Sequence, residues 1–346
     1  TGEEELCFIE EPYLSSPPLK DEEHDRYERP EKSAKSAAVL EHARAALECC
    51  IHRGFGKHGL PYTGSGDWND ALDRVGGESV WLGWFFAYCA ARFAELLERL
   101  GADGAAHYRQ YAAEAGSAAD AAFNGKWYLR ALYADGEALG GGERIDSVAQ
   151  SWAVLSGFGS ETRAASAMDS ALFRLWDREH RLIRLLDPPY SDRESSPGYI
   201  TGYGEGFREN GGQYTHGAIW LAIAALRLGR SAEGTAMLET LLPETHEERI
   251  YQAEPFVLPA DISTARGHEG LAGWTWYTGS AGWYFRAVTR ELLGLRMRDG
   301  RLYIESPVLP EFSVRWTDDA GRTHTIERSP GGITVDGKRY DGGGLP

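Results

Sequence analysis

The sequence predicts a mainly α-helical fold, a toroid of α/α hairpins followed by a small antiparallel β appendage. Three observations lead to this prediction. Apolar residues recur with the period of a helix in most segments before residue 295. Glycine-containing turns join these segments in pairs, roughly 55 to 75 residues apart, as in stacked or ring-closed helix pairs. After residue 295 short alternating runs separated by turn residues are typical of antiparallel strands.

The chain divides into three parts. Pro17, Pro18 and Pro30 lie beside a run of charged residues, so we expect an irregular lead-in segment at residues 1–34. We expect residues 35–295 to form the helical portion, which contains the candidate site segments discussed below, and residues 296–346 to form the β-rich appendage. The strands expected in the appendage are 302–304, 312–316, 323–326 and 333–335.

The sequence pattern of residues 35–295 predicts pairs of helices joined by short turns, with long polar loops between the pairs. The strongest helix is 78–100, in which Trp81, Trp84 and Tyr88 lie close to a 3.6-residue period. The other expected helices are 36–51, 105–123, 145–155, 162–176, 215–228, 231–242 and 284–293. The loops 187–212 and 251–273 are too aromatic for disorder, so we expect them to form the walls of a site.

Composition excludes several classes of function. The 346 residues include 36 basic and 52 acidic ones, a net charge of −16, which argues against nucleic acid or an anionic membrane surface as the main partner. No run of 18 apolar residues exists, so we expect no membrane contact by this chain. Cys7, Cys49, Cys50 and Cys89 lack metal-binding spacing, so we expect free thiols, no metal site and a reducing, cytoplasmic compartment. The 11 Trp, 17 Tyr and 12 Phe suit a sugar ligand, although aromatic residues more often fill cores.

The segment GSGDWND at residues 64–70 is the first candidate site. Its glycines allow a sharp loop, and two carboxylates flank an indole and an amide, so acid chemistry beside a stacking surface is possible. The alternative is structural: Asp70 or Asp73 begins a helix and Trp68 fills a core gap. Taken alone, the structural interpretation is the commoner one.

Two further segments place polar groups at the start of a helix. Residues 208–216, RENGGQYTH, are costly to bury unless a polar ligand satisfies them, although His216 alone could be a core histidine. In GWTWYTGSAGW at residues 273–283, Thr278, Gly279 and Ser280 offer N–H groups and hydroxyls that favour an oxyanion. The alternative there is a Ser/Thr cap between core aromatics.

Together these motifs resemble the inverting phosphorylases of glycoside hydrolase family 94. The resemblance extends over residues 8 to about 310 and includes GESVWLGWF, RIDSVAQSWAVLSG and PGYITGY besides the three segments above. The motifs are most similar to the phosphorylase domain of cyclic β-1,2-glucan synthases and to β-1,2-oligoglucan phosphorylases. The resemblance implies an (α/α)6 barrel, incomplete here at its amino-terminal side, since only 69 residues precede Asp70.

The resemblance also implies roles for single residues. Asp70 matches the general acid, which must hold a proton near neutral pH and is therefore expected to be buried, and Trp68 matches an aromatic lining the donor-sugar subsite. Arg208 and Glu209 match a pair that contacts sugar hydroxyls. The residues that match the phosphate site are His216, Thr278 and Gly279. Because a β-1,2 linkage bends the glucan, aromatic platforms are expected, and the candidates are Tyr190, Tyr199, Tyr203 and Trp274.

The expected reaction is phosphorolysis of a β-glucosidic bond, or its reverse, with inversion to α-glucose 1-phosphate. Phosphate is a co-substrate, and the resemblance implies no cofactor. The expected partners are a β-glucan oligosaccharide, phosphate or glucose 1-phosphate, and the missing amino-terminal part of the enzyme or a homodimer partner. The chain is expected to be cytoplasmic, or the cytoplasmic part of a membrane-bound synthase.

Two other functions remain open. An inverting glycoside hydrolase on the same toroid would use Glu209 or Asp261 to activate water opposite Asp70. A non-catalytic glucan-binding or structural fragment is the second alternative, which the expected absence of the amino-terminal part makes plausible. Dependence of sugar release on phosphate separates the first alternative from the phosphorylase.

Overall fold

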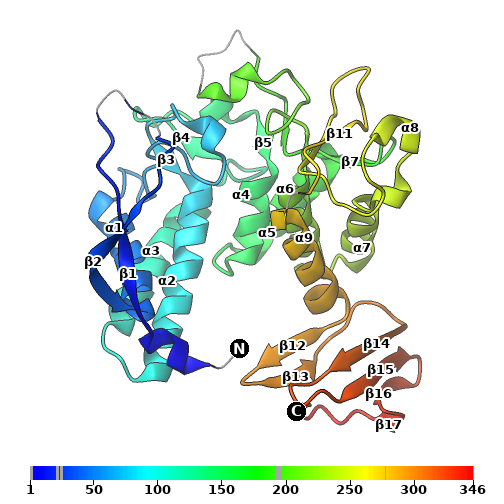
Figure 1. The fold of residues 1–346 in the computed structure, drawn as a ribbon. Coiled ribbons are helices and arrows are strands. Elements are labelled where there is room, and N and C mark those ends of the chain that lie inside the picture. Colours follow the sequence, from blue (N-terminus) through cyan, green and yellow to red (C-terminus); the bar gives the residue numbers. More distant parts are fainter. Residues whose placement is uncertain (1–2, 21–22, 24–25, 192–196, 277, 346) are drawn as a thin grey trace.

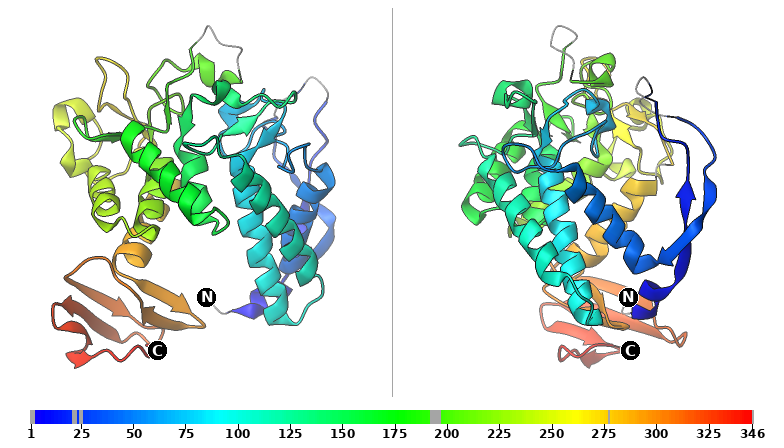
Figure 2. Two further views of the ribbon diagram at one scale, coloured as in Figure 1. Left: turned by 180° about the vertical axis from the view of Figure 1, so that it is seen from behind. Right: turned by 90° about the vertical axis from the view of Figure 1, so that its left-hand side faces the viewer.

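The computed structural model describes residues 3–345 except 21–22, 24–25, 192–196 and 277, and leaves out the side chain of Thr278. Helical hairpins stand side by side above a strand-rich carboxy-terminal part (Figure 1). In the views of Figure 2 the helices run roughly parallel to one another, and long loops gather at one end of them. The helices, in chain order, are α1 (Val39–Arg53), α2 (Val80–Leu100), α3 (Ala105–Ala121), α4 (Ser147–Leu155), α5 (Glu161–Arg174), α6 (Thr215–Arg227), α7 (Ser231–Thr240), the short α8 (Glu248–Tyr251) and α9 (Thr278–Arg286).

The helices form two rows. Helices α2, α4, α6 and α9 contact one another in that order and make an inner row, with α2 and α9 at its two ends. Helix α3 packs on α2, α5 on α4, and α7 on α6, so each inner helix but the last is backed by its hairpin partner. Helix α6 is buried along nearly its whole length and is apolar on all sides, as expected of a helix at the centre of a core. The core of the inner row also holds the indoles of Trp81, Trp84, Trp152 and Trp220.

Helix α2 agrees with the predicted helix 78–100 to within two residues, and its two ends are fixed by local caps. The hydroxyl of Ser79 accepts a hydrogen bond from the Leu82 N–H at 3.0 Å and caps the first turn. Gly101, with φ of 63°, ends the helix in the left-handed conformation that glycine adopts easily. Among the described residues, α2 is the helix long and apolar enough to cross a membrane, with 56% of the tested window buried in the protein. A buried core helix of this length meets the same criteria.

Two-residue strands precede three of the inner helices. They are β3 (Glu78–Ser79), β5 (Ile145–Asp146) and β9 (Gln213–Tyr214), which pair with β4 (Ala131–Leu132), β8 (Leu186–Asp187) and β10 (Asp261–Ile262), and β10 also pairs with β11 (Ala272–Gly273). The sequence places β3 and β5 inside the helices predicted at 78–100 and 145–155, because their buried side chains continue the helical periodicity. These pairings fix the entry of the chain into α2, α4 and α6, at the end of the helices where the loops gather.

The prediction of an irregular lead-in at residues 1–34 is wrong in part. After a 3-10 turn at Glu4–Phe8, strand β1 (Glu10–Ser15) pairs antiparallel with β2 (Glu31–Ala38), which extends into the segment predicted as helix 36–51. The side chains of both strands are mostly exposed. The pair is therefore held by backbone hydrogen bonds, and a charged, proline-containing sequence carries little signal of it.

The carboxy-terminal part consists of strands, as expected. A pi-helical turn at Ala287–Leu292 leads from α9 into β12 (Leu295–Arg298), which pairs with β13 (Arg301–Ile304). The remaining strands form a sheet in the order β14 (Phe312–Thr317), β15 (Thr323–Ser329), β16 (Gly332–Val335) and β17 (Lys338–Arg339). The other elements are the pair β6 (Trp176–Asp177) and β7 (Leu182–Ile183) and the 3-10 turns Asp70–Leu72, Leu139–Gly142, Tyr199–Gly202 and Pro243–Thr245.

Candidate active site

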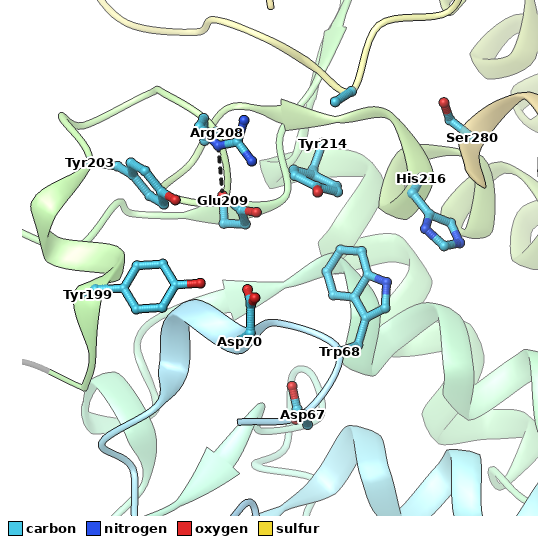
Figure 3. Close-up of a pocket in the computed structure, with 11 residues that line it drawn as sticks. Asp67, Trp68, Asp70, Tyr199, Tyr203, Arg208, Glu209, Tyr214, His216 and Ser280 are labelled. Atoms are coloured by element: carbon cyan, nitrogen blue, oxygen red, sulfur yellow. Dashed lines mark hydrogen bonds and ion pairs between the residues drawn. The ribbon is translucent and has the colours of Figure 1, made fainter. Parts of the chain in front are cut away.

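A pocket of about 390 Å³ opens among the loops at the N-terminal ends of α6 and α9. Its volume is in the range of small-molecule sites. Figure 3 shows the side chains that line it, which are Asp67, Trp68, Asp70, Tyr199, Tyr203, Arg208, Glu209, Tyr214, His216, Ala260 and Ser280. The loops that were expected to wall a site, 187–212 and 251–273, both contribute to it.

The GSGDWND loop forms the floor of this pocket. Trp68 packs against Tyr214, His216 and Trp220, with ring centroids 5.4, 5.7 and 5.3 Å away. Asn69 accepts a hydrogen bond from the Ala71 N–H at 3.2 Å and so caps the 3-10 turn that begins at Asp70. Asp70 itself is exposed. The expected burial of Asp70 beside Trp68 is therefore wrong, because the turn directs the carboxylate into the open pocket while the indole packs on α6 (Figure 3).

Asp67 lies underneath this loop, and its side chain is fully buried. It accepts hydrogen bonds from the Ser79 hydroxyl at 2.6 Å, from the Asn69 N–H at 2.9 Å, and from both Arg130 amino groups. Burial alone would raise a carboxyl pKa, but Arg130 and Ser79 hold the pKa of Asp67 below its usual value. Asp67 is thus an ionised anchor of the loop.

One wall of the pocket carries Tyr199, which begins the 3-10 turn Tyr199–Gly202, and Tyr203, which directly follows this turn. The start of this turn is fixed to the segment that follows the GSGDWND loop. The Tyr199 N–H donates to the Asp73 carboxylate at 3.1 Å, and the Arg74 N–H donates to the Pro197 carbonyl at 2.9 Å. The Tyr199 hydroxyl points toward Asp70 (Figure 3). Burial, and then a hydrogen bond to Asp70, raise the pKa of Tyr199. The Asp70 carboxylate therefore has a neighbouring hydroxyl that can donate to it.

Arg208 and Glu209 form the upper wall. Arg208 has φ of 50°, an uncommon conformation for a residue with a side chain, and such backbone strain is found preferentially at functional sites. Its Nε lies 3.4 Å from Glu209 Oε2, and its Nη1 lies 3.8 Å from Asp261 Oδ1. The guanidinium also lies over the Trp274 ring, 4.6 Å from the centroid, and 5.5 Å from that of Tyr203. Burial lowers the pKa of Arg208, but Glu209 and Asp261 outweigh it and the pKa is raised.

Several buried polar atoms around the pocket lack a hydrogen-bond partner among the residues that the structure describes. They include Thr215 Oγ1 and His216 Nε2, while Arg208 Nη1 and Asp261 Oδ1 make no hydrogen bond with the described residues and face each other only as the 3.8 Å ion pair. Burial also raises the pKa of Asp261 above its usual value. Unpaired buried polar atoms are destabilising, so their concentration here is typical of a site that a polar ligand completes.

His216 lines the pocket on the far side of Trp68 from Asp70 (Figure 3). It is the second residue of α6, and its ring lies 4.3 Å from that of Trp220 and 5.9 Å from that of Trp283. Burial among these indoles lowers the pKa of His216 to about 4. The imidazole is therefore neutral at physiological pH and can donate one N–H.

The first turn of α9 faces His216. A Cβ atom on Gly279 would lie 4.0 Å from His216 Nδ1, so the Gly279 backbone is close to the imidazole. Ser280 is buried and lines the pocket. Thr278 begins the helix, but its side chain lies outside the described part of the chain, so the expected approach of its hydroxyl to His216 stays a prediction.

The structure brings most of the expected residues together in one place. Asp70, Trp68, Tyr203, Arg208, Glu209 and His216 line the pocket, Trp274 contacts Arg208, and Gly279 lies beside His216. Tyr190 does not belong to this group, because its ring is 3% exposed and lies under the Arg144 guanidinium, 3.6 Å from it. The expectation of an aromatic platform at Tyr190 is wrong.

Three residues at or below the pocket were not singled out from the sequence: Tyr214, Ala260 and Arg130. Tyr214 belongs to the candidate segment 208–216 and lies two positions before His216, so a local signal for it exists. Ala260 and Arg130 carry no such signal. Within the described ranges, no group of three or more His, Cys, Asp or Glu side chains is arranged to hold a metal ion.

Comparisons with known proteins identify the family of the chain. The chain is 39% identical over 347 residues to the cyclic β-(1,2)-glucan synthase NdvB of Rhizobium meliloti (strain 1021), a match that covers 95% of this chain and 12% of NdvB. It is 30% identical to the N,N'-diacetylchitobiose phosphorylase of Vibrio proteolyticus, over 84% of this chain and 38% of that protein. The chain thus spans well under half the length of both relatives.

A solved sialidase structure aligns with a TM-score of 0.60 at 13% identity, over 87% of this chain and 30% of the sialidase. At this identity the likeness concerns the fold alone. The sequence model of the family described as the glycosyl hydrolase 94 superfamily, catalytic domain, matches residues 7–294, a range that includes every helix from α1 to α9. The chain therefore belongs to the glycosyl hydrolase 94 superfamily.

Proposed function

We propose that this chain carries the catalytic centre of an inverting phosphorylase that transfers a glucosyl residue from a β-glucoside to phosphate. The observation that carries the proposal is that Asp70 and His216 line one pocket on opposite sides of Trp68 (Figure 3). An inverting displacement needs an acid on one side of the sugar and a nucleophile on the other. The family membership and the phosphorylase relative support the same reaction class.

In the proposed reaction, Asp70 gives its proton to the glycosidic oxygen while a phosphate oxygen attacks the anomeric carbon from the opposite face. The bond from the anomeric carbon to the glycosidic oxygen breaks, and a bond to the phosphate oxygen forms. The products are α-glucose 1-phosphate and a glucan with a free hydroxyl, and the proton of hydrogen phosphate restores Asp70 through solvent. Trp68 packs against the sugar face, and Arg208 and Glu209 bind its hydroxyls.

The phosphate would bind between His216 and the first turn of α9. Gly279 and Ser280 present backbone N–H groups at a helix N-terminus, and neutral His216 can donate one N–H without a charge of its own. The expected side-chain contact is the Thr278 hydroxyl. Because phosphate is itself an anionic nucleophile, the reaction needs positioning of phosphate and no second carboxylate as base.

We further propose β-1,2-linked glucans as substrates. The name of the NdvB relative points to this linkage, as do the motifs shared with the β-1,2-glucan branch of the family. A sharply bent chain needs an open pocket with aromatic faces. Tyr199 and Trp274 are 45% and 64% exposed, and Tyr203 lies beside Arg208, so these rings are available at the mouth of the pocket.

We also propose that further helices from polypeptide beyond this chain cover α2 and close an (α/α)6 barrel. Two apolar hollows support this proposal. A groove of about 520 Å³ lies along α1 and α2, lined among others by Leu47, Leu82, Phe85, Phe93 and Leu96. A cavity of about 310 Å³ between the inner helices is lined by Trp81, Trp152, Trp220 and Trp283 and reaches Trp68. Exposed apolar surface of this extent is typical of an interface.

The activity test supplies sophorose-type oligosaccharides with and without inorganic phosphate. We expect phosphate-dependent formation of glucose 1-phosphate, with the α anomer identified by NMR. Release of glucose at the same rate without phosphate would support the hydrolase, with Glu209 or Asp261 activating water. Glucan binding without turnover at saturating phosphate would support the inactive fragment. In the synthetic direction, faster phosphate release from α-glucose 1-phosphate with cellobiose than with sophorose would reject the β-1,2 linkage and leave the phosphorolysis standing.

The barrel proposal is tested by light scattering and by binding of a dye that fluoresces on apolar surfaces. We expect the chain alone to bind the dye, and co-expression with the part of NdvB outside the matched region to give a complex that does not. A homodimer that binds no dye would mean that a second copy covers these hollows.

A further inference from the structure

A buried arginine below the GSGDWND loop belongs to neither the acid nor the phosphate end of the pocket. The side chain of Arg130 is 3% exposed, and that of its main partner Asp67 is 0% exposed. Arg130 Nη2 donates to Asp67 Oδ1 at 2.5 Å and Nη1 donates to Asp67 Oδ2 at 2.7 Å. This is the two-point geometry in which a guanidinium holds a carboxylate in both position and orientation.

The same guanidinium connects three segments that are distant in sequence. Through Asp67 it holds the loop that carries Trp68 and Asp70. Ser79, which caps α2, donates to the same Asp67 carboxylate at 2.6 Å. Arg130 Nε lies 3.4 Å from Oδ2 of Asp146, whose Oδ1 caps α4 by accepting from the Val148 N–H at 2.8 Å. One side chain therefore sets the loop against the N-terminal ends of two inner helices.

The charges of this cluster make Arg130 hard to replace. Asp67 and Asp146 are both buried and share one guanidinium, and burial raises the pKa of Asp146 while the pKa of Asp67 is lowered. Removing the guanidinium would leave a buried carboxylate unpaired, which is strongly unfavourable. A lysine keeps the charge but offers a single point donor in place of the planar fork, so it cannot fix the orientation of Asp67.

We propose that Arg130 is a positioning residue for the reaction: acting through Asp67, it holds the loop so that Trp68 and Asp70 face the sugar. The inference rests on the proposed phosphorolysis for its kinetic consequences. The phosphate end is carried by α6 and α9, which Arg130 does not contact in the bonds described above. Loss of the fork should therefore lower kcat and leave the KM for phosphate unchanged.

The test compares Arg130→Lys, Asp67→Asn and the double variant D67N/R130M with wild type in the full chain, assembled with any partner needed for activity. The matched control is Arg174→Lys, since Arg174 makes a similar two-nitrogen contact with Asp187, at 2.9 and 2.5 Å, away from the pocket. We expect R130K to lose about 100-fold in kcat, the loss expected for a displacement of about 1 Å, with the phosphate KM within about twofold of wild type. The double variant should be no worse than the poorer single variant, because the two residues act as a unit.

Amide hydrogen exchange of residues 64–73 gives a second readout that needs no turnover. We expect faster exchange of this segment in R130K and wild-type exchange in R174K. Wild-type kcat and exchange in R130K would overturn the proposal. It would equally be overturned by losses in kcat and phosphate affinity together with faster exchange in all helices, which would make Arg130 a general structural residue. If wild type shows no phosphorolysis, the proposed function fails, and the exchange of residues 64–73 still decides whether Arg130 positions the loop.

Discussion

The Nδ1 atom of His216 lies 4.0 Å from the position that a Cβ atom on Gly279 would occupy. The first turn of α9 therefore lies close to the start of α6, with room for about one methyl group between Gly279 and the imidazole of His216. The two residues are nevertheless far apart in sequence. Helix N–H groups and a neutral imidazole on the two sides of this space are donors that the proposed phosphate site requires. Glycine at position 279 keeps that space open.

Replacing Gly279 by alanine should weaken phosphate binding without weakening the fold. The added methyl group meets no atom closer than His216 Nδ1, and alanine stabilises a helix relative to glycine by up to about 1 kcal/mol. We expect a rise of about tenfold in the KM for phosphate, equivalent to about 1.4 kcal/mol, with an unchanged or higher melting temperature. Gly282→Ala is the matched control, because it lies in the same helix and its Cβ would meet nothing within 4 Å. Equal phosphate KM values in G279A and wild type would contradict the proposed anion site.

His216 should make the protein less stable as the pH falls. Its pKa is about 4 in the folded protein because of burial and near 6.5 in an unfolded chain, so the unfolded chain binds the extra proton between these values. The stabilisation is therefore complete above pH 6.5 and is lost progressively as the pH falls toward 4. Between pH 7 and pH 5 this loss amounts to about 2 kcal/mol in the free energy of unfolding.

Urea unfolding at pH 7 and pH 5 measures this effect. We expect His216→Asn to show a smaller loss of stability between the two values than wild type, by about 2 kcal/mol. The control is His52→Asn, since the His52 side chain is 79% exposed, and it should keep the wild-type pH dependence. The same pH dependence in H216N and wild type would show that burial does not lower the pKa of His216.

Asp70→Asn should abolish turnover and leave sugar binding largely intact. An amide keeps the size of the carboxyl group but cannot give its proton to a glycosidic oxygen. We expect less than a few per cent of the wild-type rate, with glucan binding by calorimetry changed by no more than a few-fold. Asp73→Asn is the comparison three residues further along the chain, because Asp73 accepts its hydrogen bond from the Tyr199 N–H and is given no role in proton transfer. Retention of a substantial rate by D70N would exclude Asp70 as the acid.

The fold and the pocket differ in how far the sequence predicts them. Helix α2 was predicted within two residues because its buried face repeats with the helical period, which is a local signal. Trp68, Asp70, Arg208 and His216 lie in segments that were singled out because polar and aromatic side chains are dense around glycines, which is also a local signal. Their expected roles came from the resemblance to the family, because the local pattern alone favoured a structural role for Trp68 and Asp70. The β1–β2 pair was missed because backbone hydrogen bonds hold it and its side chains carry no alternation.

Arg130 shows the limit of reasoning from local patterns. It joins Asp67 across 63 positions, and neither residue has a neighbour in sequence that indicates the pair. Tyr190 shows the opposite error, since an aromatic residue in a loop predicted to wall the pocket is instead buried against Arg144. Which side of a loop a ring faces depends on tertiary packing, which the sequence pattern does not contain.

Trp274 should contribute to sugar binding through its contact with Arg208. Its ring is 64% exposed and its centroid lies 4.6 Å from the guanidinium, so it limits the movement of Arg208 and offers an open face. We expect Trp274→Ala to raise the KM for the glucan about fivefold, equivalent to about 1 kcal/mol, and Trp274→Phe to recover most of the loss. Trp276→Ala is the control, because Trp276 is 66% exposed and donates its hydrogen bond to Glu254, away from the pocket lining. Equal effects of W274A and W276A would contradict a specific role for Trp274.

Gly198 should prove necessary for the close contact between the turn Tyr199–Gly202 and the 3-10 turn that begins at Asp70. It has φ of 149°, and a Cβ atom there would overlap the Ala71 carbonyl oxygen and the Asp73 carboxylate. Gly198→Ala must therefore displace the turn Tyr199–Gly202 from the turn that begins at Asp70, at a cost of about 2 kcal/mol in stability.

We expect G198A to lower kcat and raise the KM for the glucan, because the Tyr199 hydroxyl moves away from Asp70 while His216 and Gly279 stay in place on α6 and α9. The phosphate KM should therefore stay near its wild-type value. Gly202→Ala, four residues further along the same turn, is the matched control, since its Cβ would meet nothing within 4 Å. Steady-state kinetics of both variants and their melting temperatures decide the matter. A kcat loss in G202A as large as that in G198A would mean that the turn tolerates no substitution at all, and the close approach at Gly198 would then have no special part in placing Tyr199 beside the acid.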